Sequence, residues 1–259
     1  MSDDEDTDTT RIAYGGKSVY GARIGVLMLE SRFPRIPGDM GNAASWPFPV
    51  LYRVVAGASP QRVVRERAAG LLAPFLDAAR DLVRLGADGI TSTCGFLSLF
   101  QQEIAAAAGV PVAMSSLMQV AMVDRLLPPG RRTGILTVSA TSLTAEHLAR
   151  AGVPTDTPMM GTESGREFTR AILGDEPRLD VAAAERDILD AGAALVAAHP
   201  EVGAIVLECT NMAPYARALS QSLSMPVFDI HSFVSWFHAG IAPRDFGPPA
   251  SAPRPWRER

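Results

Sequence analysis

The sequence predicts an α/β protein made of two pseudo-symmetric parallel-sheet domains, with the active site in the cleft between them. Short apolar runs alternate with helical segments along the 259 residues, which is the order that produces parallel sheets with helical crossovers. The chain also repeats itself. Its only two cysteines, Cys94 and Cys209, each follow an apolar run, and each is followed 17 residues later by a proline, Pro111 and Pro226.

The first half begins with an acidic tail over residues 1–19 and a buried strand over 23–29. Residues 30–49 are rich in proline and glycine and show no helical or strand period, so we expect this long loop to border the site and to carry part of its specificity. Further strands are predicted at 50–55, 88–93 and 110–114, and helices at 61–85 (with a break near 70–74), 97–108 and 118–127.

The second half repeats this order. Its strands are predicted at 132–138, 158–162, 202–208 and 226–230, and its helices at 142–151, 164–173, 179–198, 213–223 and 232–239, with Ser142 as the N-cap of the first helix. Residues 243–259 are predicted to be a tail. The expected domains are therefore 20–115 plus 227–242, and 116–226.

Composition narrows the class of protein. A hydrophobic content of 47% indicates an ordinary globular chain, and a net charge of −4 argues against nucleic acid as a partner. The acidic start differs from a secretion signal, and no apolar run is long enough to span a bilayer, so we expect a cytoplasmic protein that does not bind membranes. The wide separation of the cysteines matches no metal-ligand spacing, and no phosphate loop or cofactor motif is visible.

The positions of the two cysteines are the main functional signal. In parallel sheets ligands bind beyond the carboxyl ends of strands, and both cysteines fall at such an end, just before a helix. The helix dipole and its unpaired N–H groups favour a thiolate and can hold a carboxylate. One thiolate could then remove a Cα proton while the other thiol returns one. A buried cysteine can also be a small core residue, but the matched positions favour catalysis.

From Arg23 to Ala239 the chain resembles the aspartate/glutamate/hydantoin racemase superfamily, most specifically in residues 92–95 (Ser-Thr-Cys-Gly) and 208–211 (Glu-Cys-Thr-Asn). The resemblance implies cofactor-independent chemistry beside a carboxylate, with Cys94 and Cys209 as the acid–base pair. It also implies a substrate site that contains the residues flanking the cysteines, which are Thr93, Gly95, Phe96, Thr210 and Asn211.

The chain departs from glutamate racemases at three places. Gly95-Phe96 replaces Asn-Thr, Asn211 replaces a histidine, and Glu30-Ser31-Arg32 replaces Asp-Ser-Gly. We therefore predict a racemase or epimerase of a small carboxylate that uses two cysteines. The alternatives are a one-cysteine decarboxylase, lyase or cis–trans isomerase of a carboxylate, and a small-molecule binding protein without turnover.

Three residues outside the cysteine motifs complete the candidate site. Arg32, in the long loop with Arg35, could bind a second carboxylate, and Asp229 and His231 could orient a thiol or titrate near neutral pH. Glu208 is predicted to be structural, because strand alternation points it away from Cys209. A small carboxylate is the expected partner, and the sequence leaves open whether identical chains associate.

Overall fold

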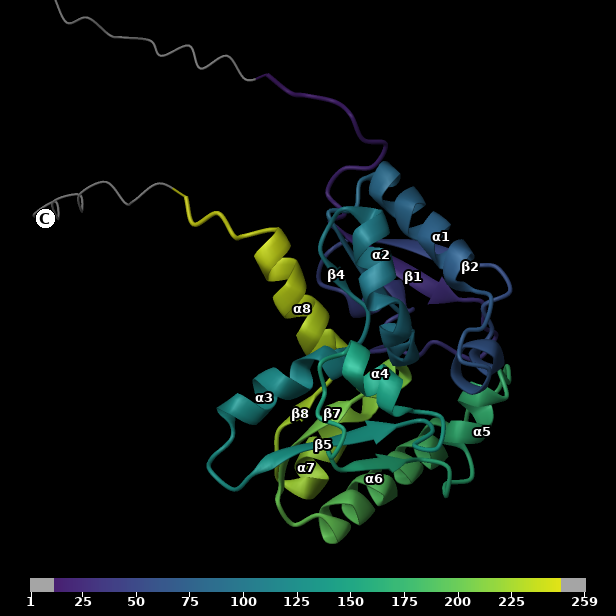
Figure 1. Ribbon diagram of the computed structural model, residues 1–259, viewed down its shortest axis with the longest axis vertical. Coiled ribbons are helices and arrows are strands. Elements are labelled where there is room, and N and C mark those ends of the chain that lie inside the picture. The colour runs from purple at the N-terminus through teal and green to yellow at the C-terminus, as the bar shows by residue number, and fades with distance from the viewer. Residues whose placement is uncertain (1–11, 248–259) are drawn as a thin grey trace, which may run out of the picture.

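The protein, a computed structural model that describes residues 12–247, contains two four-stranded parallel sheets. The outer parts of both expected tails, residues 1–11 and 248–259, lie outside the described residues. Figure 1 shows the two halves one above the other, each with helices around its sheet. The first sheet has the order β2-β1-β3-β4 and the second β6-β5-β7-β8, so the strand orders are equivalent, which confirms the prediction of two similar α/β halves.

The first sheet is built on the apolar strand β1 (Ile24–Leu29), flanked by β2 (Val50–Val55) and β3 (Gly89–Ser92), with β4 (Val112–Ala113) at the edge. Helices α1 (Leu72–Leu85) and α2 (Gln101–Ala108) pack beside each other in this half. In α1 the buried residues Phe75, Ala78, Ala79 and Leu82 recur at helical spacing and form the face that packs on the sheet. Residues 61–65 form a short π-helix (η2), so the expected break before α1 is confirmed.

The second sheet has the same plan. Strands β5 (Arg132–Thr137) and β7 (Val202–Leu207) are central, and β6 (Met159–Gly161) and β8 (Val227–Phe228) are at the edges. The long helix α6 (Val181–Ala198) begins at Asp180, whose side chain accepts a hydrogen bond from the Ala183 N–H, and it packs against α7 (Ala216–Leu223).

Helix α4 (Ala145–Arg150) begins later than expected, because Thr144 and not Ser142 is its N-cap. Thr144 and His147 form a reciprocal capping box there. The remaining helix of this half, α5 (Phe168–Leu173), follows β6 and buries Phe168, Ala171, Ile172 and Leu173. None of the helices in residues 12–247 combines the length and the apolar character that a bilayer crossing requires.

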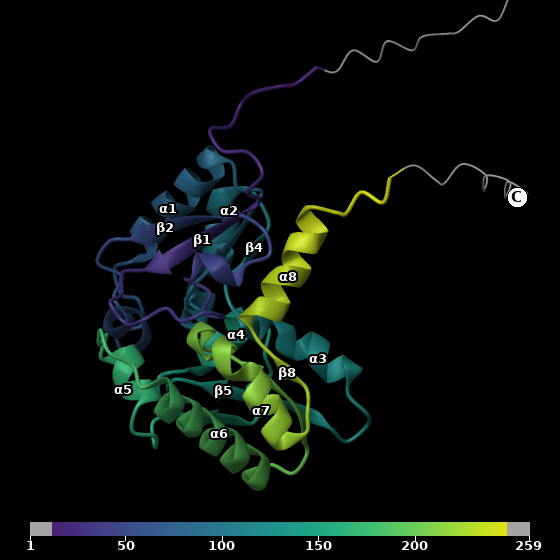
Figure 2. The ribbon, with the colours of Figure 1, turned by 180° about the vertical axis from the view of Figure 1, so that it is seen from behind.

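The two halves exchange their closing helices. Helix α3 (Val120–Leu126) follows the first sheet but packs beside β5, where the Asp124 carboxylate accepts a hydrogen bond from Thr133 N–H. Helix α8 (Ile230–Ile241) follows the second sheet but packs on the first, with Phe233 and Val234 in one apolar cluster with Ile24. Figure 2 shows α8 running up beside the first half after the chain leaves β8.

This exchange corrects one expected boundary. The segment 227–242 was expected to belong to the first domain as a whole. Only α8 does so, because β8 pairs with β7 and completes the second sheet, as β4 completes the first. Residues 17–19 also differ from an unpacked tail, since Lys17 contacts Asp88 at 2.6 Å and Val19 N–H donates to Leu85.

Candidate active site

Both cysteines lie where a strand ends and a helix begins. Cys94 follows β3 and is the N-cap of the 3-10 helix η3 (Gly95–Phe100), which continues into α2. Cys209 follows β7 and is the N-cap of the 3-10 helix η5 (Thr210–Tyr215), which continues into α7. The structure thus confirms the predicted position of each thiol at a helix N-terminus, although both helices begin earlier than expected.

A single enclosed pocket brings the two cysteines together. The pocket is small: its accessible cavity volume is about 20 Å³, which is room for roughly one water molecule. The flanking residues expected from the sequence line it, together with one that was not expected: Thr93, Gly95, Phe96, Thr210, Asn211 and Glu208. The remaining walls are apolar, from Leu29, Phe33, Pro60, Val64, Val138, Ile172 and Leu173. Both halves of the protein therefore contribute to one site.

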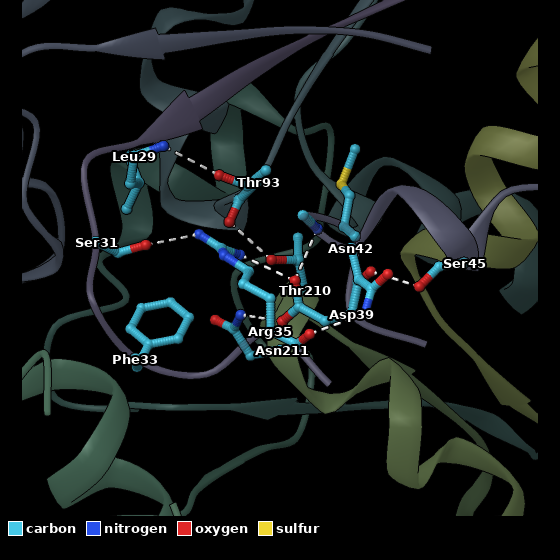
Figure 3. A network of polar contacts seen from close by, with 12 residues as sticks. Leu29, Ser31, Phe33, Arg35, Asp39, Asn42, Ser45, Thr93, Thr210 and Asn211 are labelled. Carbon is cyan, nitrogen blue, oxygen red and sulfur yellow. Dashed lines mark hydrogen bonds and ion pairs between the residues drawn. The ribbon is translucent and has the colours of Figure 1, made fainter. Parts of the chain in front are cut away.

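Two threonines join the halves at the pocket. The hydroxyl of Thr210 donates to the carbonyl of Thr93 at 2.7 Å, and the hydroxyl of Thr93 accepts from Leu29 N–H at 3.1 Å (Figure 3). Because both contacts are buried, they hold the end of β1 and the two cysteine loops in a defined arrangement.

A chain of polar contacts runs from Cys209 into the long loop. The Cys209 thiol donates to Asn211 Oδ1 at 3.6 Å, and Asn211 Nδ2 donates to Asp39 at 2.6 Å. Asp39 is also paired with Arg35 at 3.0 Å, in a contact whose two side chains are only 3% and 14% exposed (Figure 3). Since Phe33 lines the pocket and Asp39 reaches Asn211, the structure confirms that the loop borders the site.

Burial governs the protonation of both thiols. It raises the pKa of Cys94 to about 12, with the nearby Glu208 adding to the rise and the N–H of Phe96 partly opposing it. Burial likewise raises the pKa of Cys209 well above the ordinary value, and Glu208 again adds to it. The expectation that the helix ends would favour thiolates is therefore wrong for this closed pocket, where loss of water outweighs the helix dipoles.

Glu208 is a pocket residue that the sequence analysis did not predict. Its side chain is fully buried in the pocket wall, where Oε2 accepts from the Thr137 hydroxyl at 2.7 Å while Oε1 has no protein partner among the described residues. Burial raises its pKa to about 8. The alternation argument failed because β7 ends at Leu207, so the period of two does not extend to Glu208. The signal in the sequence that could have identified it is its position directly before Cys209.

Gly95 is small because Glu208 occupies the adjacent space. A Cβ at residue 95 would overlap Glu208 Oε1 and lie 2.5 Å from the backbone oxygen of Glu208. We therefore expect Gly95→Ala to destabilise the protein by about 1–3 kcal/mol, as overpacking does. Urea unfolding measures this cost, and it should be smaller in a Glu208→Ala background, where only the backbone contact remains. An equal cost in both backgrounds would show that the carboxyl group does not set the size of residue 95.

Three predicted site residues do not line this pocket. Arg32 is at the surface, 73% exposed, and pairs with Asp175 at 3.3 Å. Asp229 is the N-cap of α8 and accepts from Ser232 N–H, and His231 stacks on Trp46 with ring centroids 4.3 Å apart. The expectation that these three residues belong to the same site as the cysteines is corrected to this extent. Asp229 and His231 belong to the start of α8 rather than to a strand end, because β8 ends after Phe228.

Comparison with known proteins agrees with this geometry. A family model described as Asp/Glu/Hydantoin racemase matches residues 57–233. A dimethylsulfoniopropionate lyase from Durusdinium sp. clade D is 28% identical over 236 residues, which cover 86% of this chain and 76% of the lyase. Dimethylsulfoniopropionate lyase 5 from Emiliania huxleyi is 29% identical over 229 residues, which cover 83% of this chain but only 45% of that longer protein.

Among solved structures, allantoin racemase from Klebsiella pneumoniae superposes with a TM-score of 0.61 at 20% identity, over 90% of this chain and 96% of the racemase. At this level of identity the match establishes a shared fold.

Proposed function

Since the chain belongs to the Asp/Glu/hydantoin racemase family, we propose that it is a cofactor-independent lyase of a small carboxylate. The enzyme removes a proton from the carbon next to the carboxylate and expels a leaving group from the following carbon. The observation that carries the proposal is one enclosed pocket lined by both Cys94 and Cys209. The similarity to two dimethylsulfoniopropionate lyases supports elimination as the outcome.

The substrate carboxylate binds at the helix ends beside the cysteines. The first N–H groups of a helix have no partner inside it, and those of η3 and η5 begin next to the two thiols. The N–H of Phe96 contributes a hydrogen bond at Cys94 and that of Asn211 at Cys209, so both point into the reacting region. Such donors stabilise the negative charge that develops on a carboxylate when its Cα proton is removed.

The reaction needs one thiolate. The thiolate takes the Cα proton and becomes a thiol, and the electron pair moves onto the carboxylate to form an enediolate. The pair then returns to form the carbon–carbon double bond while the bond to the leaving group breaks and that group departs with its electrons. For dimethylsulfoniopropionate the products are acrylate and dimethyl sulfide, and the thiol later releases its proton to water.

The apolar walls suit such a substrate. Phe33 and Phe96 belong to the pocket, and aromatic rings attract methylated cations, although the Arg35 guanidinium already lies 4.6 Å from the centroid of the Phe33 ring. Val64, Val138 and Ile172 leave little polar surface on the far side. An apolar, enclosed site also keeps water away from the enediolate, which would otherwise be reprotonated before elimination.

Racemisation or epimerisation is the second candidate, because both cysteines lie in the same pocket. Elimination uses one base, whereas inversion at Cα requires a second group that returns a proton from the opposite face. Two thiols at equivalent positions of the repeat are what inversion needs, as the sequence prediction stated.

The test is to incubate the purified protein with dimethylsulfoniopropionate and measure dimethyl sulfide and acrylate together. We expect both in equal amounts, and neither from the Cys94→Ala/Cys209→Ala double variant. Other carboxylates with a leaving group on the β carbon define the range of substrates. If none of them yields an unsaturated acid while a chiral carboxylate racemises, the lyase proposal is wrong and the second candidate replaces it.

A further inference from the structure

We propose that Glu208 is a catalytic residue that acts as a neutral carboxylic acid and donates its proton, in a hydrogen bond, to the substrate's carboxylate and then to the enediolate. This inference rests on the proposed function in one respect, that the pocket binds a carboxylate. It applies equally to elimination and to racemisation, because both pass through the same enediolate.

The geometry of Glu208 leaves one oxygen for a ligand. The residue lies directly before Cys209 and lines the pocket with both thiols. Thr137 occupies Oε2, whereas Oε1 is buried and has no protein partner among residues 12–247. Buried polar atoms are nearly always hydrogen-bonded, so an unpartnered oxygen in the wall of a binding pocket, here packed beside Gly95, indicates an atom whose partner is the ligand.

The surroundings of Glu208 favour its neutral form. Gly95 from η3, Thr137 from β5 and Ser116 from η4 approach it, and the titratable neighbours are the thiols Cys94 and Cys209. Within the described part of the chain, no cationic side chain is bonded to its carboxyl group. The buried ion pair of Arg35 with Asp39 contacts Asn211 through Asp39.

A buried carboxylate without a cation is costly, and burial accordingly raises the pKa of Glu208 to about 8. At neutral pH the side chain therefore carries a proton. Oε1 has no protein partner among the described residues, so a proton on this oxygen is available for donation to a ligand.

A neutral acid at this position helps the reaction, whereas an ionised one opposes it. The enediolate concentrates negative charge on the substrate's oxygens, and a donor placed there in advance contributes about 10²–10³-fold in rate. An ionised Glu208 would repel the same oxygens. Its negative charge also contributes to the raised pKa of both thiols and so makes the thiolate base harder to form.

Proton linkage on binding tests the proposal without any turnover. The probe is 3-(methylthio)propanoate, a carboxylate with an uncharged far end, titrated calorimetrically at pH 8 in two buffers of different ionisation enthalpy. Binding of this anion should fix the proton on Glu208, so the wild type should take up a fraction of a proton and Glu208→Gln none. The thiols do not interfere, because the pKa of each lies well above pH 8.

Release of protons on binding, instead of uptake, would identify the competing explanation. If an ionised Glu208 binds a cationic group of the substrate, then 3-(trimethylammonio)propanoate should release protons on binding, and 3-(methylthio)propanoate should cause no uptake. Either proton release with the first probe or zero uptake with the second overturns the neutral donor. Proton uptake without any formation of unsaturated acid would instead leave the donor standing and reject the lyase.

Infrared titration of the protein alone covers the case in which neither probe binds. The carbonyl band of a protonated carboxyl group should be present at pH 7, disappear as the pH rises through 8, and be missing in Glu208→Gln. If wild type and Glu208→Gln give the same spectra at pH 7, Glu208 is ionised and the proposal fails.

Kinetics then separate a catalytic role from a structural one. Glu208→Gln keeps a neutral donor and should stay within about tenfold of wild-type kcat/KM, whereas Glu208→Met, of similar size, should lose about 10²–10³-fold. The wild-type rate should level off above pH 8 because Glu208 ionises, whereas the Glu208→Gln rate should continue to rise with pH as more thiolate forms. Equal activity of the Met variant, or an unchanged alkaline limb in the Gln variant, contradicts the assignment.

Discussion

Replacing both Cys94 and Cys209 by alanine should abolish proton abstraction, with a loss of at least about 10³-fold that reflects the absence of any general base. Both thiols line the pocket, whereas its other titratable side chain, Glu208, carries its proton at neutral pH. The assay is deuterium uptake at Cα from heavy water together with release of the unsaturated product. Retention of either signal in the double variant would place the base outside the two cysteines.

The single variants distinguish the two candidate reactions. An elimination requires only the thiol that acts as the base, so one of Cys94→Ala and Cys209→Ala should keep product formation and the other should lose it. A racemisation requires both, so each variant should stop inversion, although one of them can still exchange the Cα proton of one enantiomer. Thermal unfolding of each variant is the control, since a buried cysteine is also a packed core residue.

Asp39→Ala should be the most damaging change in the long loop. It leaves the Arg35 guanidinium buried without its partner, and removing one member of a buried ion pair costs about 3–5 kcal/mol. It also removes the acceptor of Asn211 Nδ2, so Cys209 loses an oriented neighbour and turnover should fall as well. Urea unfolding measures the first effect, and product formation in the remaining folded protein measures the second.

Asp77→Ala is the matched control for this prediction. Asp77 pairs with Arg80 at 3.0 Å, the same distance as the buried pair, but its side chain is 76% exposed. Exposed pairs contribute roughly 0–1 kcal/mol, so this variant should remain close to the wild type. If the two aspartate variants lose equal stability, the loop is not held by its buried ion pair.

The sequence was sufficient to predict the two similar α/β halves, because an internal repeat can be recognised from neighbouring residues alone. Apolar runs and helical segments recur in the same order in both halves, and this places Cys94 and Cys209 at equivalent strand ends without any knowledge of distant contacts. The family resemblance then implied the flanking residues Thr93, Gly95 and Asn211, which the structure places in the same pocket.

Contacts between segments far apart in the chain could not be predicted from the sequence. Arg32 pairs with Asp175 of the other half. The sequence of the loop alone does not reveal this partner, so Arg32 was predicted to bind a substrate carboxylate. The carboxyl group of Glu208 faces Gly95, over a hundred residues away, and only the packed structure shows that this glycine and this glutamate depend on each other. The protonation of the thiols likewise follows from burial, which no local pattern reveals.

The exchange of α3 and α8 makes the two halves of the repeat a single folding unit. A fragment that ends in the turn before β5 would leave one face of β1 without α8, exposing Ile24 and Val26 to water. The complementary fragment would lack α3 against its own sheet. Neither half has a complete core, so the protein should unfold in one cooperative transition. Two separately produced halves should gain structure only when mixed, by each supplying the helix that the other lacks.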